Sequence, residues 1–593
     1  MSPRRAAALA AAAALALTLS AGPAAAEPRD PFPPSFPATV PAEPRLDEKR
    51  ATASFLEHDK VADWLERYPR RGRVTDATFS KKYGNWAVKV WSGDAGEIAT
   101  GKVDDRTGDV TEAWTGPQVA WKMARGFEGA FGGKEINSAP VWLLFSLAFL
   151  LGLADLRRPL SLRNLDLLAL LSFSVSLWFF NRGDIFTSVP LAYPPLAYLL
   201  GRMLWTAARG RSPSMRPLWP VWALLAATVF LTGFRVGLNV QASNVIDVGY
   251  AGVIGAHRIA NGEAPYGHMP VQGDLKACGP ADAEGEVRDR IQTNGRCESS
   301  NDRGDTYGPV AYEAYLPGYL VLGWTGKWDD LPAAHFTAIL FDVLCIVGLA
   351  LVGRRFGGAR LAATLAFAWA AYPFTQYVSS SNTNDAILPA LLIWGFWLVT
   401  SPWTRGAFVA LAGWAKFAAL LVAPLWLSYP DAKGRLRSKT AFVVAFALAT
   451  LASFWILLLE PDPVHAARVF WDRTLGWQIG RESPFSIWDW RQYHAAGIPD
   501  LHRVQQVLEI LLVVGAIAAY FLPRRKSPLQ LAALTAALLL GFQLVLTHWF
   551  YLYIPWFFPF VAFVVLAPAR ELRRGGVAET RHEHEIRELV PAG

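Results

Sequence analysis

Long apolar runs recur along most of this 593-residue chain, and they constrain its fold more than any other feature. Many of them reach the roughly 17–25 residues that an α-helix needs to cross a bilayer. The composition agrees, with 52% hydrophobic residues, 25 Trp, 34 Phe and only 18% charged residues. The sequence therefore predicts a mainly α, polytopic transmembrane helical bundle of about 11–13 spans that lies in the lipid bilayer.

The loops between the runs show how the chain is threaded. When successive runs cross the membrane in alternate directions, every short loop rich in Arg and Lys falls on the same side, which is the positive-inside distribution. The net charge of +8 is explained by these cytoplasmic loops and implies no nucleic-acid partner. The eleven clear spans are 140–156, 165–180, 189–207, 218–236, 335–353, 361–378, 387–399, 440–459, 504–522, 529–546 and 554–566.

One apolar segment, 407–427, does not fit this threading. It begins and ends beside cytoplasmic basic residues, yet about 21 residues are long enough to cross only once. Either the segment is a re-entrant pair of half-helices around Gly413, Trp414, Ala415 and Lys416, or one of its boundaries is misplaced.

The N-terminus has the pattern of a secretory signal over residues 1–26: a basic start, an Ala/Leu core and small residues at Ala24–Ala26. The alternative is an uncleaved first span. Either way, the chain that follows starts outside. Residues 27–50 are rich in Pro and indicate an extended linker.

Residues 51–125 are predicted to form a small α+β extracytoplasmic domain. Val61, Trp64, Leu65 and Tyr68 have helical spacing, and "NWAVKVWSG" alternates as a half-buried strand with Trp86, Val88 and Val90 on one face. A further hairpin follows. One helix, a hairpin and "KVDDRTGDVTEAW" together resemble a PepSY-type domain, which implies a binding or regulatory module.

The bundle is expected over residues 139–568, with two long outer loops at 237–334 and 460–503 and a cytoplasmic tail at 569–593. Both outer loops hold more polar and aromatic residues than the short basic loops do. Polar groups gathered on one face of a lipid-embedded bundle suit a reaction between a lipid-borne substrate and an external one.

Asp247 stands just beyond a predicted span, at the start of "DVGYAGVIGAHRIANG". A carboxylate there could act as a general base toward an incoming hydroxyl. It could equally cap a helix, since Asp before an apolar-periodic run is a common start signal. Gly249, Gly252 and Gly255 recur every three residues, so a helix here could bring its backbone close to a neighbour or ligand.

These residues carry a resemblance. "GYAGVIGAHRIANGEAPYG" followed by "YGPVAYEAYLPGY" resembles the first outer loop of GT-C glycosyltransferases, and in particular the bacterial polyprenyl-phosphate-mannose-dependent alpha-mannosyltransferase family. "LAGWAKFAALLVAPLWL", "RTLGWQIGRESPFSIW" and "THWFYLYIPWFFPF" are similar to later segments of that family, so the resemblance covers roughly residues 218–568. The chain departs from the family in its signal, its N-terminal domain, its extra early spans and an insertion in the first outer loop.

The resemblance implies a GT-C fold and an inverting glycosyltransferase in the bacterial plasma membrane, with its active site on the extracytoplasmic face. The donor would be a polyprenyl-phosphate sugar, mannose or a related sugar, and the acceptor a glycan or glycolipid. In the family, the acid at the position of Asp247 is the catalytic base, which favours that role here. The family also carries a lysine in the segment that holds Lys416, which could meet a lipid phosphate or else extend to the interface.

The remaining expected site residues lie in the outer segments. For the donor phosphate we expect Arg473, Arg481 and His548 beside Lys416, although both arginines could instead pair with Asp472 and Glu482 at the loop surface. Residues expected to bind substrate are His257, Arg258, Tyr266, Tyr307, Asn384 and Tyr551.

The insertion in the first outer loop contains Cys278 and Cys297, which in an oxidising compartment are candidate disulfide partners. Its acids could bind a divalent cation, or they could belong to a solvated surface loop, since no EF-hand spacing is present. These acids are Asp274, Asp282, Glu284, Asp289, Asp302 and Asp305.

Two other classes of protein compete with the enzyme. A polytopic transporter would show inverted repeats and paired interrupted helices, and the sequence shows no convincing repeat. A membrane sensor or scaffold built on the PepSY-like domain would not need two long aromatic-rich loops. Within the spans, Asp342 is expected to hydrogen-bond inside the bundle, because a charge in hydrocarbon is costly; the alternative is a functional role.

Overall fold

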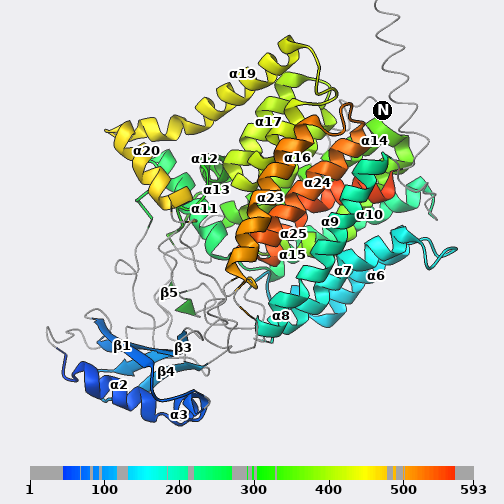
Figure 1. The fold of residues 1–593 in the computed structure, drawn as a ribbon. Coiled ribbons are helices and arrows are strands. Elements are labelled where there is room, and N and C mark those ends of the chain that lie inside the picture. The colour runs from blue at the N-terminus through cyan, green and yellow to red at the C-terminus, as the bar shows by residue number, and fades with distance from the viewer. Residues whose placement is uncertain are drawn as a thin grey trace, which may run out of the picture.

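The computed structural model describes residues 44–66, 68–80, 84–92, 97–115, 131–182, 185–210, 219–269, 290–291, 297–298, 304–326, 330–476, 478, 485–488, 499 and 501–567. The predicted signal, most of the linker and the predicted tail lie outside these residues. Figure 1 shows a small sheet domain in blue and a large helical bundle in cyan to red. The predicted fold class, a mainly helical bundle with a small α+β N-terminal domain, is confirmed.

The small domain packs two helices on one face of an antiparallel sheet whose strands follow in the order β1-β2-β3-β4. Its core contains the alternating residues predicted on one strand face, since Trp86, Val88 and Val90 are buried. A Cβ atom at Gly101 would lie 2.3 Å from the Phe55 ring, so a glycine there lets the helix approach the sheet. The elements are α2 (Glu48–Glu57), α3 (Asp59–Leu65), β1 (Arg73–Ser80), β2 (Asn85–Ser92), β3 (Glu97–Asp104) and β4 (Val110–Thr115).

The bundle begins with helices that precede the first outer loop. They are α5 (Lys134–Asn137), α6 (Ala139–Leu153), α7 (Leu162–Phe180), α8 (Ile185–Leu191), α9 (Tyr193–Arg209) and α10 (Val221–Ala242). The loop contains α11 (Asp247–Ala260), β5 (Arg290–Ile291), β6 (Cys297–Glu298), α12 (Pro309–Glu313) and α13 (Leu316–Leu322).

The second part of the bundle contains α14 (Pro332–Ala371), α15 (Pro373–Ser380), η3 (Asn384–Ala386), α16 (Ile387–Trp397), α17 (Pro402–Ala415), η4 (Phe417–Val422), α18 (Ala423–Leu427), α19 (Leu436–Ser453) and η5 (Phe454–Leu459). The second outer loop includes α20 (Pro463–Trp471) and a single π-turn, η6 (Asp472–Gly476). The chain returns through α23 (His502–Phe521), α24 (Pro528–Val545), η8 (Tyr551–Tyr553) and α25 (Ile554–Leu566).

Six helical stretches among the described residues are long and apolar enough to cross a membrane: α7, α10, α14, Leu436–Leu459, α23 and α24. Each of the eleven predicted spans falls on one or more of the helices of the bundle. The 40-residue α14 holds two predicted spans, because Gly358, with φ +72°, interrupts its helical geometry. A Cβ atom at Gly353 would lie 2.5 Å from the backbone nitrogen of Ala362, so the chain turns back tightly there.

The segment that did not fit the threading is broken at Lys416, which is extended (φ −144°, ψ 119°) between α17 and η4. Arg405, near the start of α17, donates to the carbonyl oxygens of Trp426 and Tyr429 at the end of α18. Both ends of the segment therefore meet at one level, as the re-entrant alternative requires. A Cβ atom at Gly413 would lie 2.3 Å from the Leu420 side chain, so the two limbs are close-packed.

Two pairs of charged side chains lie within the spans. Asp342 accepts hydrogen bonds from Arg235 at 2.9 and 2.5 Å and from the Trp369 indole at 2.7 Å, which confirms its predicted bonding inside the bundle. Arg202 and Asp166 form a second pair at 2.8 Å. The outward faces of α10 and α23 remain apolar and exposed, as suits contact with lipid chains.

Candidate functional site

Helix α11 starts the first outer loop, and its three spaced glycines pack as predicted against neighbouring segments. Cβ atoms at these positions would lie 2.2 Å from the Asn382 carbonyl oxygen for Gly249, 2.5 Å from the Tyr315 ring for Gly252 and 2.3 Å from the Tyr312 ring for Gly255. A larger residue at any of the three would push the helix away. The glycines therefore fix where the first residue of the helix lies.

Asp247 is that first residue, and it is half-buried. The N-cap position belongs to Ile246, which makes no side-chain cap, whereas the Asp247 carboxylate accepts a hydrogen bond of 2.8 Å from the Val248 amide. The negative charge in the first turn suits the helix dipole. Asp247 thus stabilises the start of α11 without occupying its N-cap, so the helix-start role does not compete with a role as base.

A buried ion pair lies at the tip of the re-entrant segment. Lys416 Nζ is 3.0 Å from Asp385 Oδ1, and both side chains are almost fully buried. Asp385 comes from η3, at the predicted outer end of the span formed by α14 and α15. The break between α17 and η4 is what carries the lysine to this position.

Aromatic rings surround the ammonium group of Lys416. Its Nζ lies 4.2 Å from the centre of the Tyr307 ring, 5.6 Å from Trp556 and 5.9 Å from Tyr553. Electron-rich ring faces stabilise a cation at such distances. One carboxylate and three rings therefore hold the ammonium group of Lys416 in place.

Tyr307 is near both Lys416 and Asp247. Burial raises the pKa of the Tyr307 hydroxyl well above its ordinary value, and the nearby Tyr553, Asp247 and Asp385 act in the same direction. Its backbone carbonyl accepts a hydrogen bond of 3.0 Å from the hydroxyl of Tyr266, whose ring packs edge-on against Phe470 of α20. The candidate base and the candidate phosphate-binding lysine are thus both near the same tyrosine.

A cavity of about 780 Å³ opens beside Lys416. Its polar and basic lining comes from the outer loops, the tip of the re-entrant segment and the chain after α24: Thr306, Tyr307, Lys416, Gln478, Thr547 and His548. Its apolar lining comes mainly from η4, α18, α23 and α24, with Leu420, Leu421, Pro424, Leu512, Val513, Ala516, Ile517, Phe542, Val545 and Leu546. Such a lining suits a molecule with an anionic head and a long hydrocarbon chain.

Arg473 lies in the second outer loop and faces the first one. Its Nε is 2.6 Å from Oδ2 of the fully buried Asp305, and the Gly267 amide donates to the same oxygen at 2.8 Å. The neighbouring residues Trp471 and Leu475 line the cavity. In this conformation the Arg473 side chain joins the two outer loops.

The other predicted site residues are placed as follows. His257 contacts Tyr319 through Nδ1 at 2.7 Å, and burial is the main cause of its lowered pKa, with the Arg258 charge adding to it. Arg258 pairs with Glu263. The buried Asn384 stands next to Asp385 in η3, whereas Tyr551 is in the bundle core, where its hydroxyl contacts Ser176 and Ser188.

Some predictions fall outside the described residues. These are Arg481 and Cys278, together with the side chain of Cys297, so the disulfide prediction stays a prediction. Of the acids considered for a divalent cation, only Asp305 is described. Within the described part of the chain, no three His, Cys, Asp or Glu side chains converge as a metal site would require.

Sequence reasoning missed three features of this site. Asp385 follows the predicted outer end of a span, and the same signal had singled out Asp247. Glu509 lines the cavity from within the predicted span 504–522, where any acid needs a reason. The positions of Tyr553 and Trp556 beside the Lys416 ammonium group could not be predicted from the sequence, because aromatic residues are abundant in this bundle.

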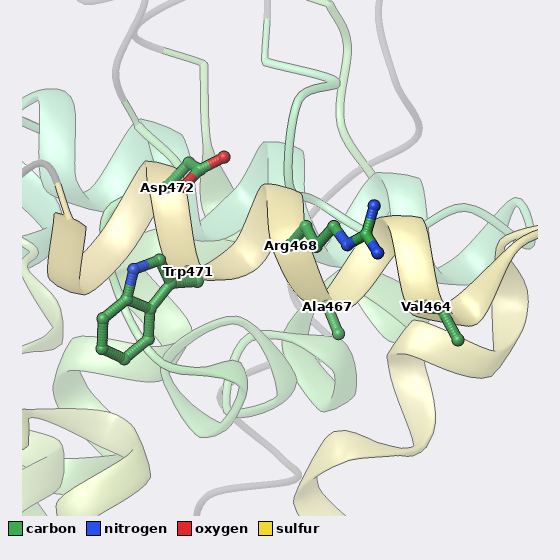
Figure 2. A pocket seen from close by; sticks show the side chains of 5 residues that line it. All are labelled: Val464, Ala467, Arg468, Trp471 and Asp472. Atoms are coloured by element: carbon green, nitrogen blue, oxygen red, sulfur yellow. The ribbon is translucent and has the colours of Figure 1, made fainter.

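A second hollow, of about 440 Å³, follows one flank of α20 and reaches η6. Figure 2 shows Trp471, Ala467 and Val464 on one side of the helix, with Arg468 and Asp472 toward the other. Trp471 also lines the larger cavity. All five side chains come from one continuous helical stretch, so no opposing wall defines a second site.

No protein-family model matches the sequence, and no curated protein matches it. Two solved structures are similar in part. ArnT from Cupriavidus metallidurans bound to undecaprenyl phosphate has 16% identity and a TM-score of 0.36, over 58% of this chain and 59% of that one. The apo oligosaccharyltransferase of Archaeoglobus fulgidus has 13% identity and a TM-score of 0.34, over 62% and 52%. The chain thus spans less than two thirds of either protein, and at these TM-scores neither similarity assigns a residue or substrate to it.

Proposed function

We propose that this protein is a GT-C type integral membrane glycosyltransferase. It transfers a sugar, mannose or a related one, from a polyprenyl-phosphate donor to an extracytoplasmic glycan or glycolipid. The observation that carries the proposal is the cavity beside Lys416, with its basic, aromatic end and its apolar walls. A polyprenyl phosphate has the same division into a charged head and a long hydrocarbon chain.

In this proposal the residues have the following roles. Asp247 accepts the proton of the acceptor hydroxyl, and the oxygen attacks the anomeric carbon of the donor sugar. The bond from that carbon to the phosphate oxygen breaks, and its electron pair stays on the phosphate. Lys416 faces the charge that develops there and stabilises it. A single displacement inverts the anomeric configuration.

The direct test is consumption of labelled donors by the purified protein in lipid nanodiscs. We expect transfer from polyprenyl-phosphate mannose, or from another sugar in the same panel, and no reaction with nucleotide sugars. If the protein consumes none of the polyprenyl-phosphate sugars, the proposed function is wrong.

The role of Asp247 is tested by Asp247→Asn, which keeps the size of the side chain and removes its basicity. Transfer should fall by about 10²–10⁴-fold, the usual worth of a general base. Asp462→Asn is a matched control, because Asp462 caps α20 through the Val464 and His465 amides and Asn caps almost equally well. Near-normal turnover by Asp247→Asn would leave it only a structural role.

The proposed face is tested by labelling single cysteines in a cysteine-free background. Asn261 is exposed at the end of α11, and a cysteine there should react with an impermeant thiol reagent in intact cells. A cysteine at Arg209, at the end of α9, should react only after the membrane is opened. The reverse pattern would put Asp247 on the cytoplasmic side and exclude the proposed orientation.

A further inference from the structure

The charges around the cavity are mixed. Among its described lining residues, Lys416 and His548 are the basic side chains and Glu509 is the acidic one. Asp385 adds a second acid through its 3.0 Å contact with Lys416. Asp385 also holds Lys416 in place, but both acids repel an anionic headgroup, so they affect which anion the cavity prefers.

Glu509 is close to the polar end of the cavity. It lies four residues, about one helical turn, beyond Gln505 on α23. The Gln505 amide donates to the Val545 carbonyl at 2.8 Å and to Thr547 Oγ1 at 3.0 Å, and Thr547 and His548 line the polar end. Glu509 therefore lines the cavity about one helical turn from the residues at its polar end.

The proposed reaction changes the charge of the lipid in this cavity. The donor is a phosphodiester with one negative charge. Transfer leaves a phosphate monoester, which carries about −1.5 to −2 at neutral pH, since its second pKa is about 6. A site containing only cations would hold this product more tightly than the donor and would be blocked by it.

We propose that Glu509 and Asp385 bias the cavity against the doubly charged product, so that the spent polyprenyl phosphate is released. This inference rests on the proposed function. Lys416 attracts both lipids, and each carboxylate repels the product about twice as strongly as the donor. The pair of acids thus determines which of the two charge states the cavity prefers.

The experiment compares two soluble probes that differ by one charge, farnesyl phosphate and its methyl diester. Their dissociation constants are measured at pH 8 on the purified full-length protein in nanodiscs. Wild type should bind the diester at least as tightly as the monoester. In Glu509→Gln the ratio should shift toward the monoester by about 3–10-fold, which is the order expected for removing one charge near the phosphate.

Two further variants and one change of pH complete the design. Asp385→Asn should shift the ratio in the same direction, and Glu57→Gln, an exposed acid of the small domain, should not shift it. At pH 5 both probes carry one charge, so the ratio should approach one in every variant. The primary variant is Glu509→Gln, because removing the buried Asp385 charge can also destabilise the protein.

The outcomes are distinguishable. If wild type binds neither probe, the proposed function fails and this inference with it. If wild type binds both probes, and Ala516→Trp, which fills the cavity, abolishes both, the site is established. An unchanged ratio in both Glu509→Gln and Asp385→Asn would then overturn the inference and leave the proposed function intact. In turnover assays, farnesyl phosphate should inhibit Glu509→Gln more strongly than it inhibits wild type.

Discussion

Two of the buried pairs of a cation and a carboxylate in the described part of the bundle differ in what surrounds them. Arg235 and Asp342 meet in the packed interior, where Arg235 also donates to Thr375 and the Ala370 carbonyl, and Trp369 donates to Asp342. Lys416 and Asp385 meet at the edge of a cavity, with aromatic rings around the ammonium group. The first pair is enclosed by protein donors and acceptors, and the second faces space that a ligand can occupy.

Under the proposed function, the enclosed pair is structural and the pair at the cavity acts on substrate. A planar guanidinium with several fixed donors suits a permanent network, whereas a lysine is a compact charge on a flexible chain. Burial and pairing alone do not distinguish the two, since both pairs are buried. Access to the cavity distinguishes them, because Lys416 lines the cavity and the Arg235–Asp342 pair does not.

The largest effect is expected from breaking the enclosed pair. Arg235→Met leaves the Asp342 charge buried without its cation, which should destabilise the protein by about 3–5 kcal/mol. Arg235→Met/Asp342→Leu replaces both charges by apolar groups and should recover most of that stability, and donor turnover with it. Thermal unfolding in nanodiscs and transfer assays measure the two effects. If Arg235→Met/Asp342→Leu is fully stable but has lost turnover, the Arg235–Asp342 pair has a role in the reaction and is not only structural.

The same double replacement at the cavity sharpens the comparison. Lys416→Met/Asp385→Leu should also recover stability relative to Lys416→Met, because no unpaired charge remains. Turnover should stay reduced by about 10²-fold, since a preorganised cation at a developing charge is commonly worth that much. Normal turnover in the stable double variant would contradict the assignment of Lys416 to the donor phosphate.

The sequence predicted the bundle well, for a physical reason. A span must be long and apolar in any membrane, so runs such as 529–546 can be predicted as spans without tertiary information. A break around Lys416 was one of the two alternatives that the sequence left open, because 21 residues cannot cross twice. Gly249, Gly252 and Gly255 predicted a close approach, although their partners Asn382, Tyr315 and Tyr312 could not be named.

The pairing of Lys416 with Asp385 could not be predicted from the sequence. Asp385 is 31 residues from Lys416 along the chain, and only the return of the re-entrant tip beside η3 brings them together. Arg235 and Asp342 are likewise joined by tertiary packing of α10 on α14. Tyr551 was expected to bind substrate because it lies in a family-like segment, and its side chain is buried in the core.

A third carboxyl group, Glu313 of α12, is governed by burial rather than by a cation. Burial raises its pKa from 4.5 to about 7, and a hydrogen bond with Trp455 offsets part of this. Between these two pKa values the folded protein holds a proton that the unfolded chain has lost. The free energy of unfolding should therefore fall by about 1–3 kcal/mol as the pH rises from about 4.5 to 7. Glu313→Gln should remove this dependence, and Trp455→Phe should steepen it. Equal unfolding profiles for wild type and Glu313→Gln would contradict the raised pKa.

The smallest effect is expected at Arg473, whose Nε contacts Asp305 between the two outer loops. Arg473→Lys keeps the charge and loses the planar fork. If the residue only joins the loops, the donor KM should change by less than about threefold, because a part-exposed ion pair contributes little. A double-mutant cycle with Asp305→Asn should then show that the stability effects of the two changes are not additive.

A ligand of the donor phosphate would behave differently. Loss of a bidentate contact should raise the donor KM by about tenfold or more and leave the acceptor KM unchanged. Arg481→Lys in the same loop is the matched variant, since it makes the same chemical change at the other arginine expected to bind phosphate. An effect on donor KM at Arg481 and none at Arg473 would leave phosphate binding to Lys416 and Arg481. An effect on donor KM at Arg473 would mean that the Arg473 side chain leaves Asp305 when the donor binds. The Arg473–Asp305 pair would then be functional, like the proposed role of Lys416, and not structural like the Arg235–Asp342 pair.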